Sequence, residues 1–202
     1  MSQILSPTTF SSEDTVALAR RLLGCELVMR DGEGQVIRRT IVETEAYHGP
    51  DDLASHASRG RTPRNRPMFG PAGHWYVYLC YGIHEMLNLV TGPRDFPAAI
   101  LIRGVAGAVG PGKLTRSLGI DRRFNGLAAQ PDTGLWLEEG EAVSGIRILE
   151  TTRVGVDYAG PVWAAKPWRF VLVSAAVRSP YTQRQSPLRG VQVAPLPRRK
   201  AK

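Results

Sequence analysis

The chain has 202 residues, of which 43% are hydrophobic, and this is enough to form the core of one domain. No segment approaches the roughly 18 uninterrupted apolar residues of a membrane span, and MSQILSPTTFSSEDT lacks the features of a secretion signal, so we expect a cytoplasmic protein. Lys and Arg number 26 against 18 Asp and Glu, which gives a net charge of +8. This excess is typical of nucleic-acid-binding proteins, with a merely basic protein of other function as the alternative.

The beginning of the chain predicts a helix and a β-hairpin. Residues 1–11 are expected to form a flexible polar arm. SSEDTVALARRLLGCEL predicts a helix, with Ser11 or Ser12 as its N-cap and Gly24 as its end. CELVMR and QVIRRTIVETEAY predict two strands joined by a DGEG turn. Residues 49–73 contain many turn formers and few large apolar side chains, so they predict a long loop, either functional or disordered.

The rest of the chain predicts further strands and one helix. The strand-like segments are HWYVYLCYG, EMLNLV, AAILIRGV, GLWLEE, SGIRILETTRVGV and WRFVLVSAA, and GPGKLTRSLGI predicts the helix. Residues 179–202 are rich in Pro and end in PRRKAK, so we expect a flexible tail. The expected fold is therefore a single α+β domain over residues 1–202, with a curved, mostly antiparallel sheet, few helices and a protruding β-hairpin.

Strand alternation sorts the segment IVETEAY into two faces. One face receives Val42, Thr44 and Ala46. The other face receives, at steps of about 6.6 Å, Ile41, Glu43, Glu45 and Tyr47. Two carboxylates and an aromatic ring on one face can present a general base to a ring-shaped ligand, whereas a charged edge strand is the alternative. The alternation by itself does not choose between Glu43 and Glu45.

The long loop and the segment after it contain arginines and aromatic residues. The arginines alternate with small residues and can lie along a phosphate backbone, or they belong to a solvated loop; they are Arg59, Arg61, Arg64 and Arg66. In HWYVYLCYG, alternation places Tyr76 and Tyr78 on one face, and Trp75 and Tyr81 on the other. Tyr81 precedes a glycine at a predicted hairpin tip, where an aromatic ring can wedge into a base stack, although core packing also explains such rings.

Three other features of the sequence are candidates for a site. Cys25 and Cys80 form no CxxC pair and lie in apolar contexts, so we expect buried free thiols. The four histidines lack HxxxH or HExxH spacing, so His56 is interpreted as a stacking or orienting residue and no metal site is expected. Residues 107–113 read GxxxxGK, but Leu114 follows where a P-loop needs Ser or Thr, so nucleotide hydrolysis is not expected.

Several long motifs together resemble the alkyladenine (3-methyladenine) DNA glycosylase family of the mammalian type. They are ETEAYHGPDDLASHASRGRTPRNRPMF, YVYLCYGIHEMLN, ILIRGV, GPGKL and RVGVDYAGPVWAAKPWRF. The resemblance runs from about Leu22 to Phe170, and nothing in the chain resembles the helix-hairpin-helix motif of other glycosylases.

The resemblance implies a catalytic and a stacking role for five matching residues. Glu45 would be the general base that activates the hydrolytic water, and Arg103 would help to place that water or the reacting nucleotide. Tyr47 would stack on one face of a flipped base, and His56 and Tyr78 would stack on the other face.

Two further residues match the family motif of the predicted hairpin. Tyr81 would fill the gap left in the duplex, and Asn88 would crowd the purine edge at which guanine carries its amino group. One feature departs from expectation, because Glu85 follows the turn closely and an acid is unfavourable at a tip that faces phosphates.

The implied function is a monofunctional DNA glycosylase of base excision repair. It would flip alkylated or deaminated purines out of double-stranded DNA and hydrolyse the N-glycosidic bond, leaving an abasic site. The resemblance implies no metal and no other cofactor, and we expect a monomer. The alternatives are a DNA-binding module without chemistry and a metal-dependent nuclease with four acids as magnesium ligands, namely Glu43, Glu45, Asp51 and Asp52.

Overall fold

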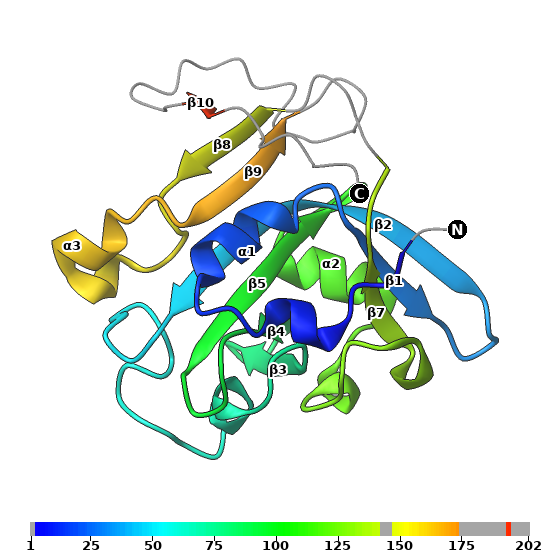
Figure 1. Cartoon of the computed structure of the whole chain (residues 1–202), viewed down its shortest axis with the longest axis horizontal. Helices are drawn as coiled ribbons and strands as arrows, with labels where there is room; N and C mark the ends of the chain where they lie inside the picture. The colour runs from blue at the N-terminus through cyan, green and yellow to red at the C-terminus, as the bar shows by residue number, and fades with distance from the viewer. Residues whose placement is uncertain (1–2, 142–146, 174–192, 195–202) are drawn as a thin grey trace.

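The computed structural model describes residues 3–141, 147–173 and 193–194 of the chain (Figure 1). The α-helices are α1 (Thr15–Arg21), α2 (Pro111–Leu118) and α3 (Gly160–Ala164). The strands are β1 (Glu26–Arg30), β2 (Val36–His48), β3 (Trp75–Cys80), β4 (His84–Val90), β5 (Ala98–Val105), β6 (Ala108–Val109), β7 (Leu135–Glu138), β8 (Arg147–Thr151), β9 (Arg169–Val173) and β10 (Val193–Ala194). Short 3-10 helices are η1 (Pro7–Phe10), η2 (Arg66–Phe69), η3 (Arg122–Phe124), η4 (Pro131–Thr133) and η5 (Asp157–Ala159).

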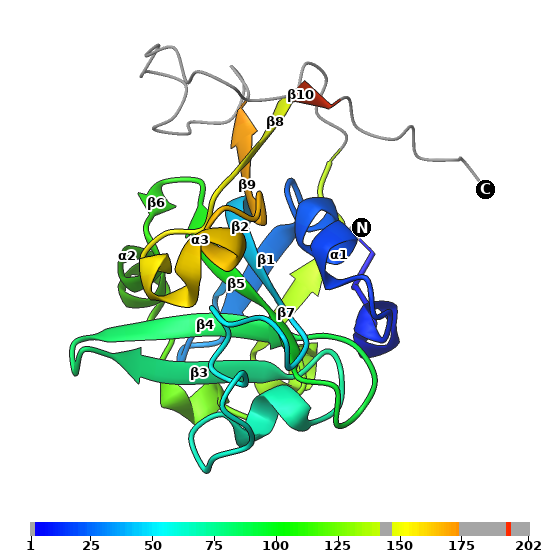
Figure 2. The same cartoon turned by 90° about the vertical axis from the view of Figure 1, so that its left-hand side faces the viewer.

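The strands pair antiparallel in the order β10-β8-β9-β2-β5-β4-β3. Strand β2 joins two parts of the sheet, because its first half pairs with β1, which also pairs with β7, and its second half lies between β5 and β9. In Figure 2, β3 and β4 run across the view while β8 and β9 stand upright, so the sheet is strongly twisted. The predicted α+β class with a mostly antiparallel sheet and few helices is confirmed.

The main hydrophobic core lies between α1, α2 and the strands. Figure 1 shows α1 across the sheet in front of β5, and the Thr44 hydroxyl on β2 donates a 2.8 Å hydrogen bond to the Ala19 carbonyl of this helix. The largest side chains that are fully buried in this core are Phe10, Leu22, Leu27, Ile41, Trp75, Leu87, Leu89, Ile100, Ile102, Leu114 and Phe170. Burial of so many large side chains fixes the register of β2 and β5, because a one-residue slip would expose them.

Strand β2 departs from the regular alternation that the sequence predicts. Ile41 and Val42 both belong to the main core, although alternation assigns them to opposite faces. The pairing of β2 with β5 shifts register on both sides of Glu43, as in a β-bulge, and a bulge turns consecutive side chains toward the same side. After the bulge, Glu45 and Tyr47 share a face and are hydrogen bonded to each other. The predicted polar face therefore does not include Ile41.

Residues 3–11 pack against the domain, in contrast to the flexible arm that the sequence predicts for residues 1–11. Leu5 and Phe10 are buried, and the Leu5 N–H donates to the Leu137 carbonyl of β7 at 2.9 Å. The apolar side chains of this mostly polar segment are thus buried in the core, and its backbone forms a hydrogen bond with the edge of β7.

Helix α1 begins later than its serine-rich start predicts. Asp14 is the N-cap, and its Oδ1 accepts a 2.9 Å hydrogen bond from the N–H of Ala17. Ser11 and Ser12 precede this cap and were the predicted candidates. A carboxylate at this position satisfies a free helix N–H and also interacts favourably with the helix dipole.

The C-terminal strands are shorter than predicted where the structure describes them. Strand β8 ends at Thr151, whereas the sequence predicts a strand as far as Val156. In the segment that follows β8, the Arg153 side chain forms a buried ion pair, which is described below. The tail predicted from Ser179 lies outside the described residues, except for β10, which pairs with β8.

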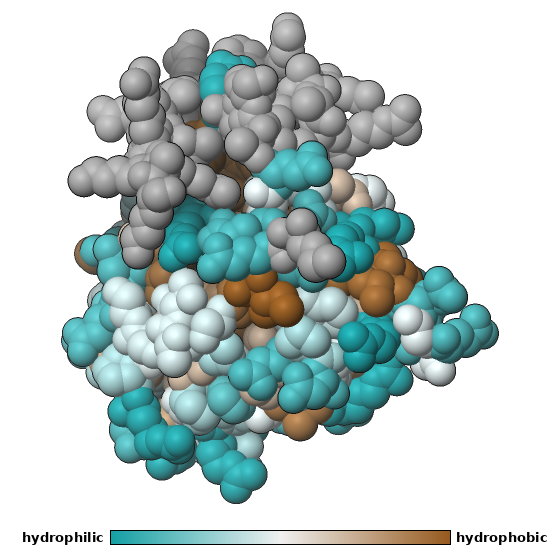
Figure 3. Space-filling view, turned by 45° about the vertical axis from the view of Figure 1, so that its right-hand side comes forward, coloured by the Kyte–Doolittle hydropathy of each residue, from teal (hydrophilic) through white to brown (hydrophobic). Residues whose placement is uncertain are grey.

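The predicted protruding hairpin is formed by β3 and β4, whose shared end extends beyond the neighbouring elements in Figure 2. Figure 3 shows a face of the molecule on which the described residues are mainly hydrophilic, with small separate hydrophobic areas. No helix in the described part of the chain has both the length and the apolar character needed to cross a membrane.

Candidate active site

A pocket of about 700 Å³ opens between the β3–β4 hairpin, loop 49–73 and the segment after β8, and β5 contributes part of its wall. This volume lies in the range of small-molecule sites in proteins. The pocket brings together six residues that the sequence selected from separate motifs, namely Tyr47, His56, Tyr78, Tyr81, Asn88 and Arg103.

Glu45 is fully buried directly behind the pocket wall. Its Oε1 accepts a 2.8 Å hydrogen bond from the backbone N–H of Val154 and lies 3.5 Å from Nη1 of Arg103. Its Oε2 accepts a 2.9 Å hydrogen bond from the Tyr47 hydroxyl. These three partners all line the pocket, so the carboxylate is oriented by residues that a bound ligand would touch.

The electrostatics of Glu45 differ from those of a surface glutamate. Burial raises the pKa of its carboxyl above the ordinary value of 4.5, although Arg103, the Val154 N–H and the Tyr47 hydroxyl act in the opposite direction. A carboxylate whose ionised form is poorly solvated, but is held by fixed donors, accepts a proton readily, as a general base must.

Glu43 is bound in a different way. Its Oε1 accepts hydrogen bonds from Nε of Arg103 at 2.9 Å and from Nε of Arg169 at 2.7 Å. The side chains of Arg103 and Arg169 are only 14% and 16% exposed, so Glu43 belongs to a largely buried cluster of charges. Arg103 thereby touches both glutamates, and its position is fixed by Glu43.

A cluster of three rings forms another part of the site. The His56 ring lies 4.6 Å from the Tyr78 ring at an interplanar angle of 70°, and its Nδ1 lies 3.2 Å from the Tyr76 hydroxyl. Burial, together with the nearby Arg64, lowers the pKa of His56, so the imidazole is uncharged at neutral pH. Burial also raises the pKa of Tyr76 to about 12. The cluster therefore offers neutral rings to a ligand.

Asn88 on β4 is held firmly in the pocket wall. Its Nδ2 donates to the carbonyls of Tyr76 at 3.0 Å and Met86 at 3.2 Å. With both donors of the amide engaged, the side chain has little freedom to move aside for a ligand substituent.

Tyr81 occupies the tip of the hairpin, where it is 91% exposed. Its backbone has φ +50°, a left-handed conformation that costs a non-glycine residue roughly 1–2 kcal/mol. Gly82 follows with φ +71°, and Ile83 beside it is also exposed. A large apolar ring that is presented to solvent on a strained backbone is a candidate for insertion between bases.

Loop 49–73 is ordered by buried polar residues. Asn65 is buried, and its Nδ2 donates to the carbonyls of His56 and Gly60, both at 2.9 Å. Its Oδ1 accepts from the N–H of Thr62 at 2.7 Å. One asparagine thus fixes the backbone around Arg59 and Arg61 and holds His56 at the pocket.

The four loop arginines differ in their contacts. Arg64 donates a 2.9 Å hydrogen bond to the Leu79 carbonyl and stacks 5.1 Å from the Tyr78 ring, so it belongs to the pocket wall. Arg61 forms an ion pair with Asp95. The remaining two, Arg59 and Arg66, are exposed, and Arg59 borders the pocket.

Glu85 does not belong to the hairpin tip. It lies in β4 with its side chain 17% exposed, and its Oε1 is 3.2 Å from Nε of Arg122 on η3. Its carbonyl accepts a 3.1 Å hydrogen bond from the Thr115 hydroxyl of α2. The acid therefore faces the body of the domain, and its charge is neutralised there.

Sequence interpretation missed Arg153, which it assigned to a strand. The guanidinium is fully buried and forms two hydrogen bonds with the Asp52 carboxylate, at 2.6 and 2.9 Å. The signal in the sequence was a lone arginine in the motif RVGVDYAG, a segment that also carries Val154. The bond from the Val154 N–H to Glu45 left no signal, because a backbone donor is independent of residue type.

Tyr158 on η5 was also missed. Its side chain is largely exposed, lines the pocket and donates a 2.9 Å hydrogen bond to the Ala54 carbonyl of loop 49–73. The two segments on this side of the pocket are therefore linked at its mouth.

The structure shows how the residues of the metal-binding and P-loop alternatives are arranged. Within the described ranges, no group of three or more His, Cys, Asp and Glu residues is arranged to hold a metal ion. Two acids of the nuclease alternative, Glu43 and Asp52, are bound to arginines. The GxxxxGK segment forms β6 and the start of α2, with Pro111 at the first helical position and in the pocket wall.

Comparison with known proteins covers most of the chain. The family model described as methylpurine-DNA glycosylase (MPG) matches residues 9–109 and 106–176. A relative from Anaeromyxobacter dehalogenans (strain 2CP-C) is 48% identical over 177 residues, which covers 84% of each chain. A relative from Methanocella arvoryzae is 45% identical over 184 residues, covering 81% of this chain and 90% of its own. One from Herpetosiphon aurantiacus is 37% identical over 217 residues and 96% of each chain.

These three relatives carry the name "Putative 3-methyladenine DNA glycosylase". The family match includes β2, the β3–β4 hairpin, β5 and the segment after β8, which are the elements that line the pocket. The chain belongs to the methylpurine-DNA glycosylase family and is an enzyme of that type, a hydrolase that acts on N-glycosyl bonds.

Proposed function

We propose that the chain is a monofunctional glycosylase that takes a damaged purine out of duplex DNA and hydrolyses its N-glycosidic bond with a water activated by Glu45. The observation that carries the proposal is the setting of Glu45, a buried carboxylate held by three residues of the pocket wall. The names of the family and of the relatives support a DNA glycosylase acting on methylated purines.

The proposed chemistry is a single displacement by water. Glu45 accepts a proton from the water, the water oxygen bonds to C1′ of the sugar, and the bond between C1′ and the purine nitrogen breaks. The electron pair of that bond leaves with the purine, where it cancels the positive charge of an alkylated base. A neutral lesion such as hypoxanthine must also take up a proton as it leaves, and in both cases the products are a free base and an abasic site. The carboxylate also stabilises the positive charge that develops on the sugar, and Arg103 orients the carboxylate and the water.

The proposed recognition uses the rings of the pocket. Tyr47 stacks on one face of the purine, and His56 and Tyr78 stack on the other, which suits electron-poor alkylated bases. Asn88 disfavours guanine by crowding its amino group. Damaged bases cost least to unstack, so part of the selectivity precedes entry into the pocket.

Contacts at the hairpin tip and along loop 49–73 would hold the opened duplex. Tyr81 fills the space left by the extruded nucleotide. The exposed Arg59 and Arg66 contact the phosphate backbone. Arg61 and Arg64 contribute less to DNA binding, because each also binds a protein partner.

The test is to incubate the protein, in EDTA, with duplexes that carry hypoxanthine, ethenoadenine or an alkylated adenine. We expect free base and alkali-labile sites, with the strand intact until alkali is added. Recovery of intact DNA from every duplex would contradict the proposal. Strand cleavage that requires added magnesium would favour the nuclease alternative, and binding of lesions without release would favour a module without chemistry.

A further inference from the structure

We propose that Arg153 and Asp52 form a positioning pair, which holds both the Tyr47 wall of the pocket and the backbone donor to Glu45 in their working geometry. This inference rests on the proposed function. It assigns a role to two residues that do not themselves touch the reacting atoms.

The first support is the completeness of the pair's contacts. Both side chains are fully buried, and the guanidinium meets the carboxylate through two nearly parallel hydrogen bonds. The same carboxylate also accepts from the N–H groups of His48 at 3.2 Å and Ala54 at 3.1 Å. Asp52 is thus fixed to the end of β2 and to the start of the loop that carries His56.

The second support is that the guanidinium ties three segments together. In addition to Asp52, Arg153 donates to the carbonyl of Ala46 on β2 at 3.0 Å and to that of Trp163 on α3 at 3.2 Å. A planar group with several donors can fix such an arrangement, whereas a lysine can satisfy only part of it. The segment after β8 is therefore docked onto β2 at the back of the pocket.

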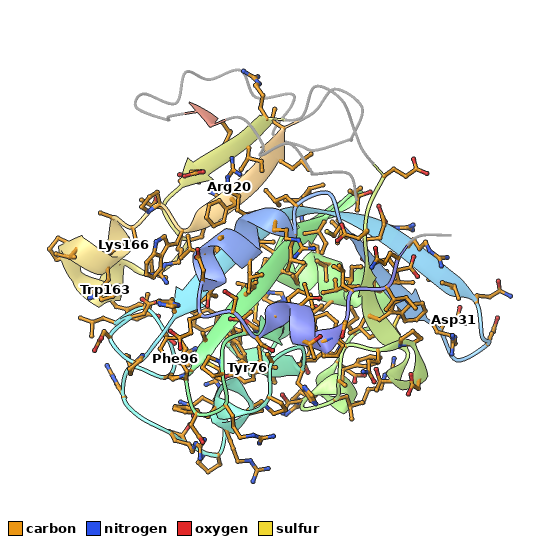
Figure 4. All side chains as sticks on the ribbon, in the orientation of Figure 1. Arg20, Asp31, Tyr76, Phe96, Trp163 and Lys166 are labelled. Carbon is orange, nitrogen blue, oxygen red and sulfur yellow. The ribbon has the colours of Figure 1, made fainter. Side chains whose placement is uncertain are left out.

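The third support is the position of Arg153 between two rings. Its guanidinium carbon lies 4.9 Å from the centre of the Tyr47 ring and 5.0 Å from that of the Trp168 ring. Lys166 also approaches the Trp168 indole, at 5.4 Å, and Figure 4 shows Lys166 close to Trp163 of α3. The tyrosine wall that faces the pocket is thus backed by a stack of cations and rings.

The fourth support is covalent. Val154 follows Arg153 directly, and the Val154 N–H is the 2.8 Å donor to Oε1 of Glu45. The bonds of the guanidinium restrain the adjoining backbone, so their loss gives the Val154 N–H more freedom to move away from Glu45. Tyr47, whose ring the guanidinium supports, is the donor to the other oxygen. The pair therefore acts on both oxygens of the proposed base.

Stability alone is a weak reason for such a pair. The cost of desolvating two charges is so large that well-packed apolar residues often serve equally well or better in the same place. Here the Nε of Arg153 is buried without a hydrogen-bond partner in the described part of the chain, which adds to that cost. Positioning of the pocket wall explains why charged groups occupy a site at which apolar residues would give equal or greater stability.

The experiment compares wild-type protein with Arg153→Lys, which keeps the charge but loses the planar fork, and with Asp52→Asn. Glu138→Gln is the matched control, since it removes the acceptor of the Arg38 ion pair on β7. Single-turnover base release is measured with saturating protein and scaled to the folded fraction. Affinity for a duplex with an abasic site, the Tm and the pH dependence of the rate complete the set.

We expect Arg153→Lys to lower the single-turnover rate by about 10²-fold, as small displacements of reacting groups do, with affinity for abasic DNA unchanged. The acid limb of its pH–rate profile should move to higher pH, because the bond from Val154 lowers the pKa of Glu45 and would be weakened. Any shift of the Tyr47 ring in this variant acts in the same direction, because the bond from the Tyr47 hydroxyl also lowers the pKa of Glu45. The two remaining charged groups around that carboxylate, Arg103 and Glu43, keep their mutual ion pair. Glu138→Gln should change only the Tm.

A lower Tm with a wild-type rate and a wild-type acid limb would overturn the inference, because it is the signature of a merely structural pair. If neither substitution gives folded protein, Trp168→Leu removes the half-buried ring behind the guanidinium and should show a smaller rate loss in the same direction; unchanged kinetics would again overturn the inference. Wild-type protein that releases no base would instead reject the proposed function.

Discussion

Glu43 and Glu45 lie two positions apart on β2 and are chemically identical, yet their surroundings differ. Glu43 meets two guanidinium groups at hydrogen-bond distance. Glu45 meets a backbone N–H, a phenol and one arginine at a longer distance. An ion pair with two cations fixes a carboxylate as an anchor, whereas neutral donors leave it free to accept a proton.

We therefore predict opposite consequences for the two amide substitutions. Glu45→Gln should reduce base release by about 10²–10⁴-fold, the usual contribution of a general base, while lesion binding is retained. Because burial raises the folded-state pKa of Glu45, protonation of this group stabilises the fold at low pH, and that stabilisation is lost as pH rises through the folded pKa. A neutral glutamine should thus leave the Tm at pH 7 equal or higher.

Glu43→Gln is the matched variant. It leaves Arg103 and Arg169 without their carboxylate, which should destabilise the fold by about 3 kcal/mol, the lower end for broken buried pairs. Thermal unfolding and single-turnover base release distinguish the two cases. A Glu45→Gln protein that unfolds well below wild type and releases base normally would refute this assignment of roles.

The pH dependence of base release offers a second residue-scale prediction. Base release needs the ionised form of Glu45, so the rate should fall as pH decreases through the raised pKa of that group, with a midpoint above 4.5. His56 has a lowered pKa and should add no step above pH 7. Single-turnover rates over a range of pH test this, and the acid limb should disappear in Glu45→Gln; a limb that persists there would belong to another group.

At the scale of elements, the β3–β4 hairpin and the bulge in β2 adapt a regular sheet to a site. The hairpin extends away from the core and presents Tyr81 on a left-handed backbone. The bulge at Glu43 lets Ile41 and Val42 both pack into the core, while Glu45 turns to the pocket side. Both features interrupt the regular strand geometry at positions in or directly beside the pocket.

The hairpin tip allows ring and backbone effects to be separated. Tyr81→Ala and Tyr81→Gly should both weaken binding to lesion duplexes by about 1–3 kcal/mol, because each removes one stacking ring. Only glycine relieves the left-handed backbone, so Tyr81→Gly should unfold at a higher temperature than Tyr81→Ala. Titration of labelled duplexes and thermal unfolding measure the two effects, and equal affinity of both variants with wild type would contradict the wedge.

For the whole molecule, we expect the net charge of +8 to act through contacts with DNA phosphates. The logarithm of the DNA affinity should fall linearly with the logarithm of salt concentration, and Arg59→Ala or Arg66→Ala should each reduce the slope by about 1. Arg39→Ala is the control, since this exposed arginine lies in β2 close to the β1–β2 turn. That turn and loop 49–73 lie on opposite sides of the view in Figure 1. An equal change of the salt-dependence slope in Arg39→Ala would mean that the net charge of the protein, and not a defined set of phosphate contacts, controls DNA binding.

Much of the fold was predictable because local patterns control it. The DGEG turn between alternating segments predicts the β1–β2 hairpin, and the apolar run AAILIRGV predicts β5 with its observed bounds. The bulge was not predictable, since it arises from the pairing of β2 with β5, and the packed position of residues 3–11 depends on the edge of β7. The prediction for the tail lies mostly outside the described residues.

The sequence by itself determined the kinds of group at the site: motifs such as ETEAY and YVYLCYG contain the acid, the rings and the exposed tip, and residue type dictates their chemistry. Only the tertiary structure decided how the two glutamates differ, because donors from β5, β9 and the segment after β8 reach them across the sheet. It also revealed the pair of Arg153 and Asp52, whose side chains meet although 101 positions separate them. Charges interact through space, and distances through space are set by the fold.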